Sequence, residues 1–198
     1  MYKMKNIIIG FIIIGLWTLS GCSALQTGFS NARNLANCDY KYRSITNLTI
    51  SDINLSQGLS PLIIPRVLSI LSGNASSIPL NFTLNLDVNN PNSGAAAFQS
   101  LLYIISIDDI RFSSGNFNQP FNVESGETKV LPMVIGIDIM ELMNNNSKSA
   151  VENIVKNFLG LGDTASKVTV QLKPSFKVGE QVFASPLYIP VNFTFGGK

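Results

Sequence analysis

The chain contains 198 residues, with 14 basic and 12 acidic side chains and no histidine. The lack of histidine excludes serine–histidine and cysteine–histidine catalysis and most zinc and copper sites, so we expect no cofactor, no metal and no catalytic residue. The nearly balanced charge also argues against a nucleic-acid partner, which requires a concentrated positive surface.

Residues 1–21 are predicted to form a lipoprotein signal peptide. Two lysines precede an apolar stretch, residues 7–19, that is shorter than the roughly 20 residues of a membrane-spanning helix. The sequence Leu-Ser-Gly-Cys at residues 19–22 resembles the bacterial lipobox. This resemblance implies that Cys22 is acylated and becomes the new N-terminus, and two or more acyl chains anchor a protein stably to a membrane. A short membrane-anchor helix is the alternative.

The residues that follow Cys22 predict where the anchored protein lies. Ser23 stands where an aspartate would resemble the inner-membrane retention signal of enteric bacteria. We therefore expect an outer-membrane anchor, with the inner membrane as the alternative. No acidic run resembling a surface-export signal follows Cys22, so we expect the folded body to face the periplasm.

Residues 22–44 are predicted to be a flexible tether, because they are small and polar and show no sustained periodicity. The folded body is then expected over residues 45–198, which is the usual length of one domain. If Cys22 carries lipid, Cys38 has no partner within the chain. Cys38 then either stays unpaired in the tether or pairs with another chain.

The body alternates apolar and polar residues with period two, the pattern of strands with one buried face. Pro190 donates no hydrogen bond and places its strand at a sheet edge, and a change of phase between Ile50 and Ile53 predicts a bulge. One-sided strands of this kind favour a mainly β protein, an immunoglobulin-like antiparallel β-sandwich. The expected strands cover residues 45–55, 81–88, 101–112, 131–139, 168–178 and 187–195.

One segment has helical periodicity instead. Apolar residues at positions 151, 154, 155, 158 and 159 predict one amphipathic helix that ends at Gly160 and covers an end or open flank of the sandwich. A second, short helix is expected over residues 65–71, with Pro65 in its first turn and Gly73 at its end.

Residues 80–117 resemble the core of the late embryogenesis abundant type 2 family, also called the water stress and hypersensitive response domain. The resemblance extends over residues 123–139 and covers roughly residues 45–195, with residues 57–77 as an insert. It implies a non-catalytic domain with protective or interaction roles. The residues that carry it are Asn90, Pro91, Asn92, Tyr103, Asp108, Asp109 and Gly115. Asp108 and Asp109 predict a hairpin turn, because no acid-rich loop accompanies them to complete the alternative, a calcium site.

Two motifs have both a structural and a functional interpretation. Asn90, Pro91 and Asn92 predict a reversal between strands, because proline extends the residue before it and asparagine side chains close turns. A ligand-contacting loop is the alternative for this motif. Thr164, within Asp-Thr-Ala at residues 163–165, resembles a short O-glycosylation motif of Bacteroidetes and follows the predicted helix.

Two classes of function follow from these observations. The first is a membrane-anchored envelope lipoprotein whose non-catalytic β-sandwich binds an envelope protein or an apolar ligand, or has a structural or stress-protective role. The second is a histidine-free hydrolase that uses carboxylates on envelope polymers. An internal cavity between the sheets would favour an apolar ligand, and two carboxyl groups about 5 to 9.5 Å apart in a cleft would favour the hydrolase.

Overall fold

The computed structural model describes residues 30–197, except for residues 57, 59, 73–74 and 179. The predicted signal peptide and the acylation site Cys22 lie outside the described residues. Within the described part of the chain, no helix combines the length and the apolar character needed to cross a membrane. The lipoprotein anchor therefore stays a prediction from the sequence.

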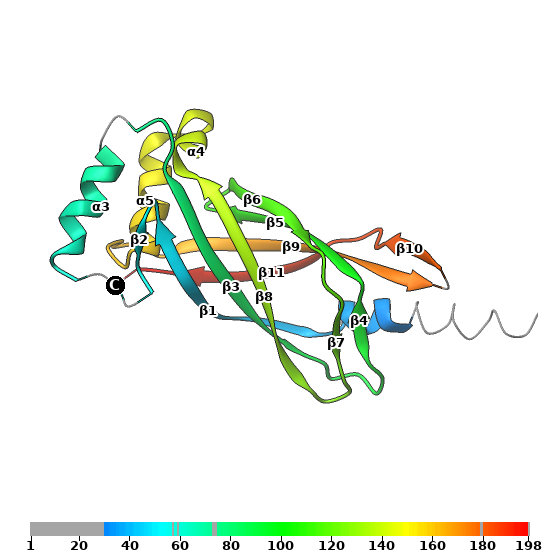
Figure 1. Ribbon diagram of the computed structural model, residues 1–198. Coiled ribbons are helices and arrows are strands. Elements are labelled where there is room, and N and C mark those ends of the chain that lie inside the picture. The colour runs from blue at the N-terminus through cyan, green and yellow to red at the C-terminus, as the bar shows by residue number, and fades with distance from the viewer. Residues whose placement is uncertain (1–29, 57, 59, 73–74, 179, 198) are drawn as a thin grey trace, which may run out of the picture.

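Two antiparallel sheets packed face to face form the body, which confirms the predicted mainly β sandwich (Figure 1). The first sheet has the strand order β2-β1-β3-β8, and the second has the order β10-β9-β5-β6 with β11 also paired to β9. A two-stranded sheet, β4-β7, completes the fold. The strands are β1 Asp39–Ile50, β2 Ile53–Asn54, β3 Pro79–Asn89, β4 Ala96–Phe98, β5 Ser100–Ile107, β6 Ile110–Phe117, β7 Phe121–Val123, β8 Thr128–Asp138, β9 Ser166–Val178, β10 Gln181–Ala184 and β11 Ile189–Phe195.

The core lies between the two sheets because alternate residues of each strand point inward. In β3, Leu80, Leu84 and Leu86 are buried, and β8 runs beside it in continuous antiparallel register. In β9, Val168, Val170 and Leu172 are buried against them, whereas Lys167 points outward. The pattern of period two therefore determines which face of each strand enters the core.

The two turn and edge predictions in the second sheet are confirmed. Strand β11 pairs only with β9, so Pro190 lies in an edge strand where its missing N–H is tolerated. Residues 101–112 do not form one strand, because Asp108 and Asp109 make the two-residue turn of the β5–β6 hairpin. Both aspartates have positive φ angles, 48° and 66°, as a hairpin turn of this length prefers.

Three helices gather at one end of the sandwich, which we call the helical end (Figure 1). The predicted helices are confirmed as α5, Lys148–Phe158, and α3, Ile63–Ser72. Gly160 follows α5 with φ 67°, as expected of the residue that stops a helix. Helix α4, Ile139–Asn145, was not predicted, and Ile139 begins this helix instead of ending a strand.

The predicted boundary between tether and body at residue 45 is wrong for the described residues. Residues 30–36 are helical, and β1 begins at Asp39 and pairs with β3 from that point. Leu35 is 1% exposed and Cys38 is 8% exposed, so both belong to the core. The polar composition of this segment is misleading because Leu35 and Cys38 turn inward and join the core.

The predicted bulge between Ile50 and Ile53 is also wrong. These two residues pair with each other across a tight turn, in which Ser51 has φ 50°. The bulges of β1 lie earlier, after Tyr42 and after Thr46. The change of hydrophobic phase in the sequence therefore marks the reversal from β1 into β2.

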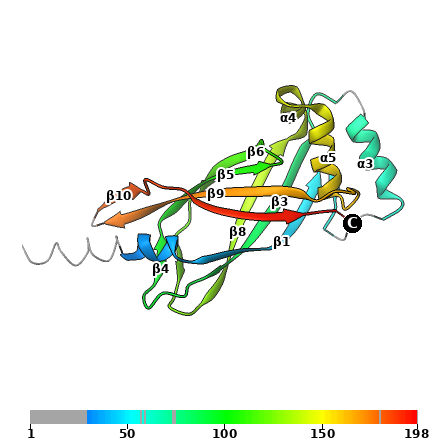
Figure 2. The ribbon, with the colours of Figure 1, turned by 180° about the vertical axis from the view of Figure 1, so that it is seen from behind.

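The end opposite the helical end is built around the reversal after β3. Helix 30–36, β4, β7 and the β9–β10 hairpin all lie there in both views (Figures 1 and 2). We call it the Asn-turn end, after residues 90–92. Since helix 30–36 lies at this end, the described chain enters the fold far from α3, α4 and α5.

Candidate functional site

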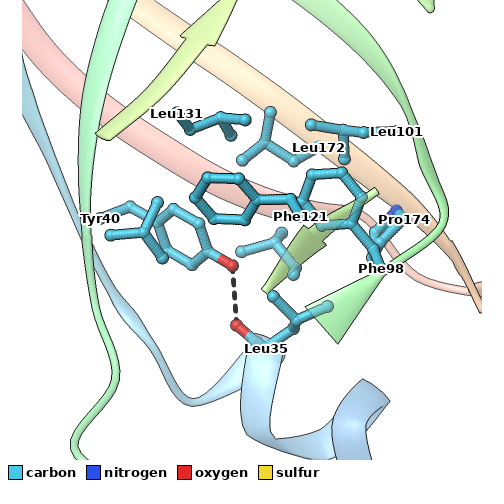
Figure 3. Close-up of a pocket in the computed structure, with 10 residues that line it drawn as sticks. Leu35, Tyr40, Phe98, Leu101, Phe121, Leu131, Leu172 and Pro174 are labelled. Carbon is cyan, nitrogen blue, oxygen red and sulfur yellow. Dashed lines mark hydrogen bonds between the residues drawn. The ribbon is translucent and has the colours of Figure 1, made fainter. Parts of the chain in front are cut away.

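The interior of the sandwich is filled. An enclosed space of about 10 Å³ lies beneath the Asn-turn end, where Leu35, Tyr40 and Phe121 meet (Figure 3). The Tyr40 hydroxyl donates a hydrogen bond of 2.8 Å to the Leu35 carbonyl, and burial raises the pKa of Tyr40. A second small space, also of about 10 Å³ and partly open, lies near Phe193. Each has room for about one water, so the described residues enclose no cavity for an apolar ligand.

A surface hollow of about 570 Å³ lies at the helical end, on the flank between the two sheets. We call it the flank hollow. It is formed by the bulged half of β1, the end of β11 and the last turn of α5, and none of the described residues that line it is charged. The lining residues are Tyr42, Ile45, Thr46, Asn47, Leu48, Leu55, Ser56, Asn157, Phe158, Gly160, Phe195 and Gly196.

Aromatic stacking closes the flank beneath this hollow. The ring of Tyr42 on β1 stacks on Phe193 of β11, with centroids 4.7 Å apart. Phe158 of α5 packs against Phe195, with centroids 4.8 Å apart. The first pair joins the two sheets directly, and the second joins α5 to the second sheet. The flank hollow therefore has an apolar, aromatic floor and a rim of small polar side chains.

Asn157 supports the flank hollow from below. Its side chain is 6% exposed, and its Nδ2 donates to the Thr164 carbonyl at 2.8 Å and to the Ser166 hydroxyl at 2.7 Å. Its Oδ1 accepts no hydrogen bond within the described structure and is itself enclosed. A Cβ at Gly162 would lie 1.8 Å from Oδ1, and one at Gly196 would lie 2.6 Å from it. Asn157 therefore lines the hollow and also positions the loop and the C-terminal residues.

The Asn-Pro-Asn motif is a reversal between strands, as predicted. Asn90 is fully buried, and its Nδ2 donates to the carbonyls of Gly94, Val123 and Glu124. Its Oδ1 accepts hydrogen bonds from the backbone and the side chain of Asn92. One amide side chain thus joins the end of β3 to the end of β7.

The same turn holds the first described helix. Asn92 donates from Nδ2 to the Asn34 carbonyl at 3.0 Å, and Asn34 donates from its own Nδ2 to the Ala95 carbonyl at 2.9 Å. Helix 30–36, which leads toward the predicted acylation site, is therefore attached to the turn by two side-chain hydrogen bonds. The motif has a structural role in positioning this segment.

The acidic side chains give no support to the hydrolase alternative. None of those in the described residues is buried. Asp138 and Glu141 line a second hollow, of about 500 Å³, beside α4. Burial is the largest single influence and raises the pKa of Asp138, but hydrogen bonds from Ser77 and from the N–H groups of Ile78, Met140 and Glu141 together outweigh it and hold the pKa below its usual range. A general acid for hydrolysis requires the opposite shift.

The remaining predicted site residues are far apart in the fold. Thr164 lies exposed in the loop between α5 and β9, at the helical end, whereas residues 90–92 lie at the other end. Cys38 is buried, and its Sγ contacts the Asn34 carbonyl at 3.3 Å. Burial, and next the neighbouring Asp39, raise the pKa of its thiol to about 11. The structure therefore assembles no single site from these residues.

The flank hollow was missed from the sequence for a definite reason. Tyr42 lies in the segment that was interpreted as a tether, and Asn47, at φ 53°, belongs to a bulge without a local sequence signature. Asn157 is buried, but it lies between the apolar positions of α5 and leaves their helical periodicity intact, so the pattern gives no sign of its burial. The one available signal was the glycine-rich segment that follows α5, because glycines that pack closely can enclose a polar side chain such as Asn157.

A family model described as "Late embryogenesis abundant protein" matches residues 85–192, more than half of the chain. No curated protein matches the chain. Three solved structures have similar folds at low identity. A crystal structure of a protein from Archaeoglobus fulgidus is 14% identical, with a TM-score of 0.38, and covers 80% of this chain and 98% of its own.

The other two structures were determined in solution. One, from Arabidopsis thaliana, is 11% identical, with a TM-score of 0.37, and covers 58% of this chain and 67% of its own. The other, of a protein described as late embryogenesis abundant, is 14% identical, with a TM-score of 0.38, and covers 93% of this chain and 88% of its own. At these TM-scores, none of the three supports a conclusion about this chain.

Proposed function

Because the chain belongs to the late embryogenesis abundant protein family, we propose that it is a non-catalytic, stress-related binding domain anchored to the bacterial outer membrane through lipid on Cys22. The domain binds an envelope protein at its surface. The observation that carries the binding mode is the filled core, whose small spaces measure about 10 Å³ each. An apolar ligand has no room between the sheets, so recognition uses the surface.

The flank hollow is the surface that we assign to the partner. Its floor is aromatic and aliphatic, and its lining is uncharged, which suits an apolar segment of another protein. A neutral contact of this kind is insensitive to salt, because no ion pair is screened. The exposed residues Thr46 and Ser56 lie on the rim and can be changed without opening the core.

Site-specific photocrosslinking in intact cells tests this assignment. A photoreactive residue at position 56 should give a discrete crosslinked species, and Thr46→Arg should abolish it by filling the flank hollow. The matched control places the photoreactive residue at Asn145, an exposed residue on the rim of the hollow beside α4. Equal crosslinking from both positions, or a species that survives Thr46→Arg, would refute the assignment.

The lipid anchor has a control built into the chain, which contains two cysteines. Metabolic labelling with a palmitate analogue should mark the wild-type protein and Cys38→Ala, but not Cys22→Ala. Mass spectrometry of the mature protein should find an acylated N-terminal Cys22. Labelling that persists in Cys22→Ala, or an unmodified N-terminus at Met1, would remove the anchor from the proposal.

The periplasm-facing orientation and the glycan at Thr164 are separate parts of the proposal. Protease added to intact cells should leave the domain intact, whereas protease added after the outer membrane is permeabilised should degrade it.

In a host with the matching glycosylation pathway, the mature protein should carry extra mass that Thr164→Ala removes. The exposed position of Thr164, beside Asp163 and Ala165, makes it accessible for modification.

Stress protection is tested directly on a dehydration-sensitive enzyme. The purified protein should preserve more activity through drying and rehydration than an equal mass of an unrelated β-sandwich protein. Equal protection by both proteins would leave only the binding role of the proposal.

A further inference from the structure

Four large apolar side chains are exposed together at the Asn-turn end. Val182 and Phe183 of β10 are 56% and 50% exposed, and Leu187 and Tyr188 in the next loop are 73% and 42% exposed. None of the four belongs to the hydrophobic residues that form or cover the core. We call them the hairpin patch. Val182 and Phe183 lie in the β9–β10 hairpin, which projects from the body at this end (Figures 1 and 2), and Leu187 and Tyr188 lie in the loop that follows it.

The hairpin patch is apolar on both of its faces. In the register of the hairpin, Phe183 lies opposite the inward-facing Phe176, whereas Val182 lies opposite the exposed Lys177. Val182 and Phe183 therefore point to opposite sides, because neighbouring strand residues alternate. A flat protein surface would cover only one side of the hairpin. A lipid bilayer surrounds an inserted hairpin and covers both.

Two lysines lie beside the hairpin patch, Lys173 next to Tyr188 and Lys177 directly across from Val182. The Lys173 ammonium lies 5.3 Å from the centre of the Tyr188 ring, and Lys177 is on the hairpin itself. Lys177 and Lys129 also line an adjacent hollow of about 360 Å³, whose described lining residues include no carboxylate. Glu180, which is 3.7 Å from Lys177, is the acidic exception. Aromatic and apolar side chains bordered by lysines are typical of protein surfaces that meet anionic headgroups.

The route of the chain brings this surface close to the anchor. Asn31, at the start of helix 30–36, lines the same hollow as Lys177. The nine residue steps from Cys22 to Asn31 span at most about 30 Å when fully extended. If Cys22 is acylated, as proposed above, the bilayer lies within reach of the hairpin patch.

We infer that the hairpin patch inserts into the interfacial region of the bilayer that holds the Cys22 lipid, with Lys173 and Lys177 at the level of the lipid phosphates. This second contact rests on the proposed anchor for its position. It turns the Asn-turn end toward the membrane and presents the helical end, with the flank hollow, to the periplasm.

A single tryptophan reports the insertion. The only tryptophan of the chain, Trp17, lies in the predicted signal peptide, so Phe183→Trp creates a unique reporter in the mature protein. The lipidated mature protein, which begins at Cys22, is reconstituted in vesicles of phosphatidylethanolamine and phosphatidylglycerol. The fluorescence of Phe183→Trp should shift to shorter wavelength and be quenched by brominated acyl chains. The matched control is Val134→Trp, at a 76% exposed apolar position on β8, which should show neither change.

The outcomes separate insertion from the other occupants and from the anchor itself. Absence of bromine quenching in a protein that mass spectrometry shows to be acylated overturns the insertion and leaves the anchor intact. A blue shift that grows with protein concentration without vesicles assigns the hairpin patch to a second copy and also overturns it. Quenching of a protein without acylation supports insertion while refuting the anchor. Lys173→Glu with Lys177→Glu should reduce quenching in anionic vesicles more than in neutral phosphatidylcholine vesicles.

Discussion

At the residue scale, the chain depends on a few enclosed polar groups whose partners are all backbone or neighbouring side chains. Asn90 is the clearest example, because both the donor and the acceptor of its side-chain amide form hydrogen bonds. Cys38 is the opposite case, a thiol whose burial suppresses its chemistry. Both residues were noted in the sequence, but only their surroundings define what they do.

Asn90→Asp should destabilise the fold strongly. The substitution removes the Nδ2 donor and directs a carboxylate at the carbonyls of Gly94, Val123 and Glu124. We expect a loss of roughly 3 to 5 kcal/mol in the free energy of unfolding, the cost of an uncompensated buried charge. Urea denaturation measures it, with the exposed Asn116→Asp as the control. Similar stability of the two variants would contradict the assigned role of Asn90.

The Cys38 thiol should react slowly in the native protein. The thiolate is the reactive form, and a pKa of about 11 leaves very little of it near neutral pH. Labelling with a thiol reagent should therefore be slow at pH 8, accelerate toward pH 11 and become rapid in denaturant. Rapid labelling of the folded protein at pH 7 would show that Cys38 is accessible and available for pairing with another chain.

At the element scale, side chains at turns and strand crossings determine where each strand or helix ends. Asp138 ends β8 and caps α4, accepting a hydrogen bond from the Met140 N–H at 2.8 Å. Tyr103 of β5 lies across its register partner Gly115 of β6 and donates to the Val134 carbonyl at 3.4 Å. The second arrangement explains why tyrosine and glycine occur together in the pattern noted in the sequence.

Asp138→Ala should lower the free energy of unfolding by about 1 to 2 kcal/mol, the usual cost of losing a helix cap. The control is Asp163→Ala, in an exposed loop. Since the pKa of Asp138 is lowered in the folded state, its contribution is complete above its ordinary value of 3.8 and is lost as the pH falls through the lower folded value. The difference between wild type and Asp138→Ala should therefore stay constant near neutrality and shrink below pH 3.8. A difference that grows on acidification would refute this account.

Gly115→Ala should destabilise the protein because the new Cβ would lie 2.5 Å from the Tyr103 hydroxyl oxygen. We expect a loss of about 1 to 3 kcal/mol, typical of overpacking. In the background of Tyr103→Leu, which removes the ring, the same substitution should cost much less. Equilibrium unfolding of all four proteins gives the coupling, and additive effects would disprove the contact.

At the scale of the whole molecule, the two ends of the sandwich have different properties. Figure 2 shows helix 30–36 at one end of the sandwich and α3, α4 and α5 at the other. The Asn-turn end carries the lysines and the hairpin patch, while the helical end carries the flank hollow and Thr164. The difference between the two ends follows from the topology, because helix 30–36, which precedes β1, packs against the turn that follows β3. An anchored domain built in this way holds one end near the membrane and the other away from it.

A chain that begins at residue 45 should fail to fold, whereas one that begins at residue 30 should fold cooperatively. The shorter chain lacks Leu35 and Tyr40, which help to fill the core, and the first half of β1. Each large apolar side chain removed from the core costs about 1.5 to 3 kcal/mol, a large part of a typical total of 5 to 15 kcal/mol. Near-ultraviolet circular dichroism and urea unfolding compare the two. Equal urea unfolding midpoints for the two chains would instead support the flexible tether predicted over residues 22–44.

The sequence by itself determined the features that depend on neighbouring residues. Alternation with period two predicted the strands around Phe82, Met133 and Val170, helical spacing predicted α5, and the Asp108–Asp109 pair predicted a turn. These patterns are sufficient to predict local structure, because the residue preferences of a strand, a helix or a turn extend over only a few neighbouring positions.

Only the tertiary structure decided the features that join distant segments. Examples are the Asn34–Ala95 hydrogen bond, the Tyr42–Phe193 stack that floors the flank hollow, and the exposure of Phe183 beyond the core. Local composition cannot distinguish an apolar side chain that will be covered from one that will project into its surroundings. That difference is determined by which part of the chain folds back beside it.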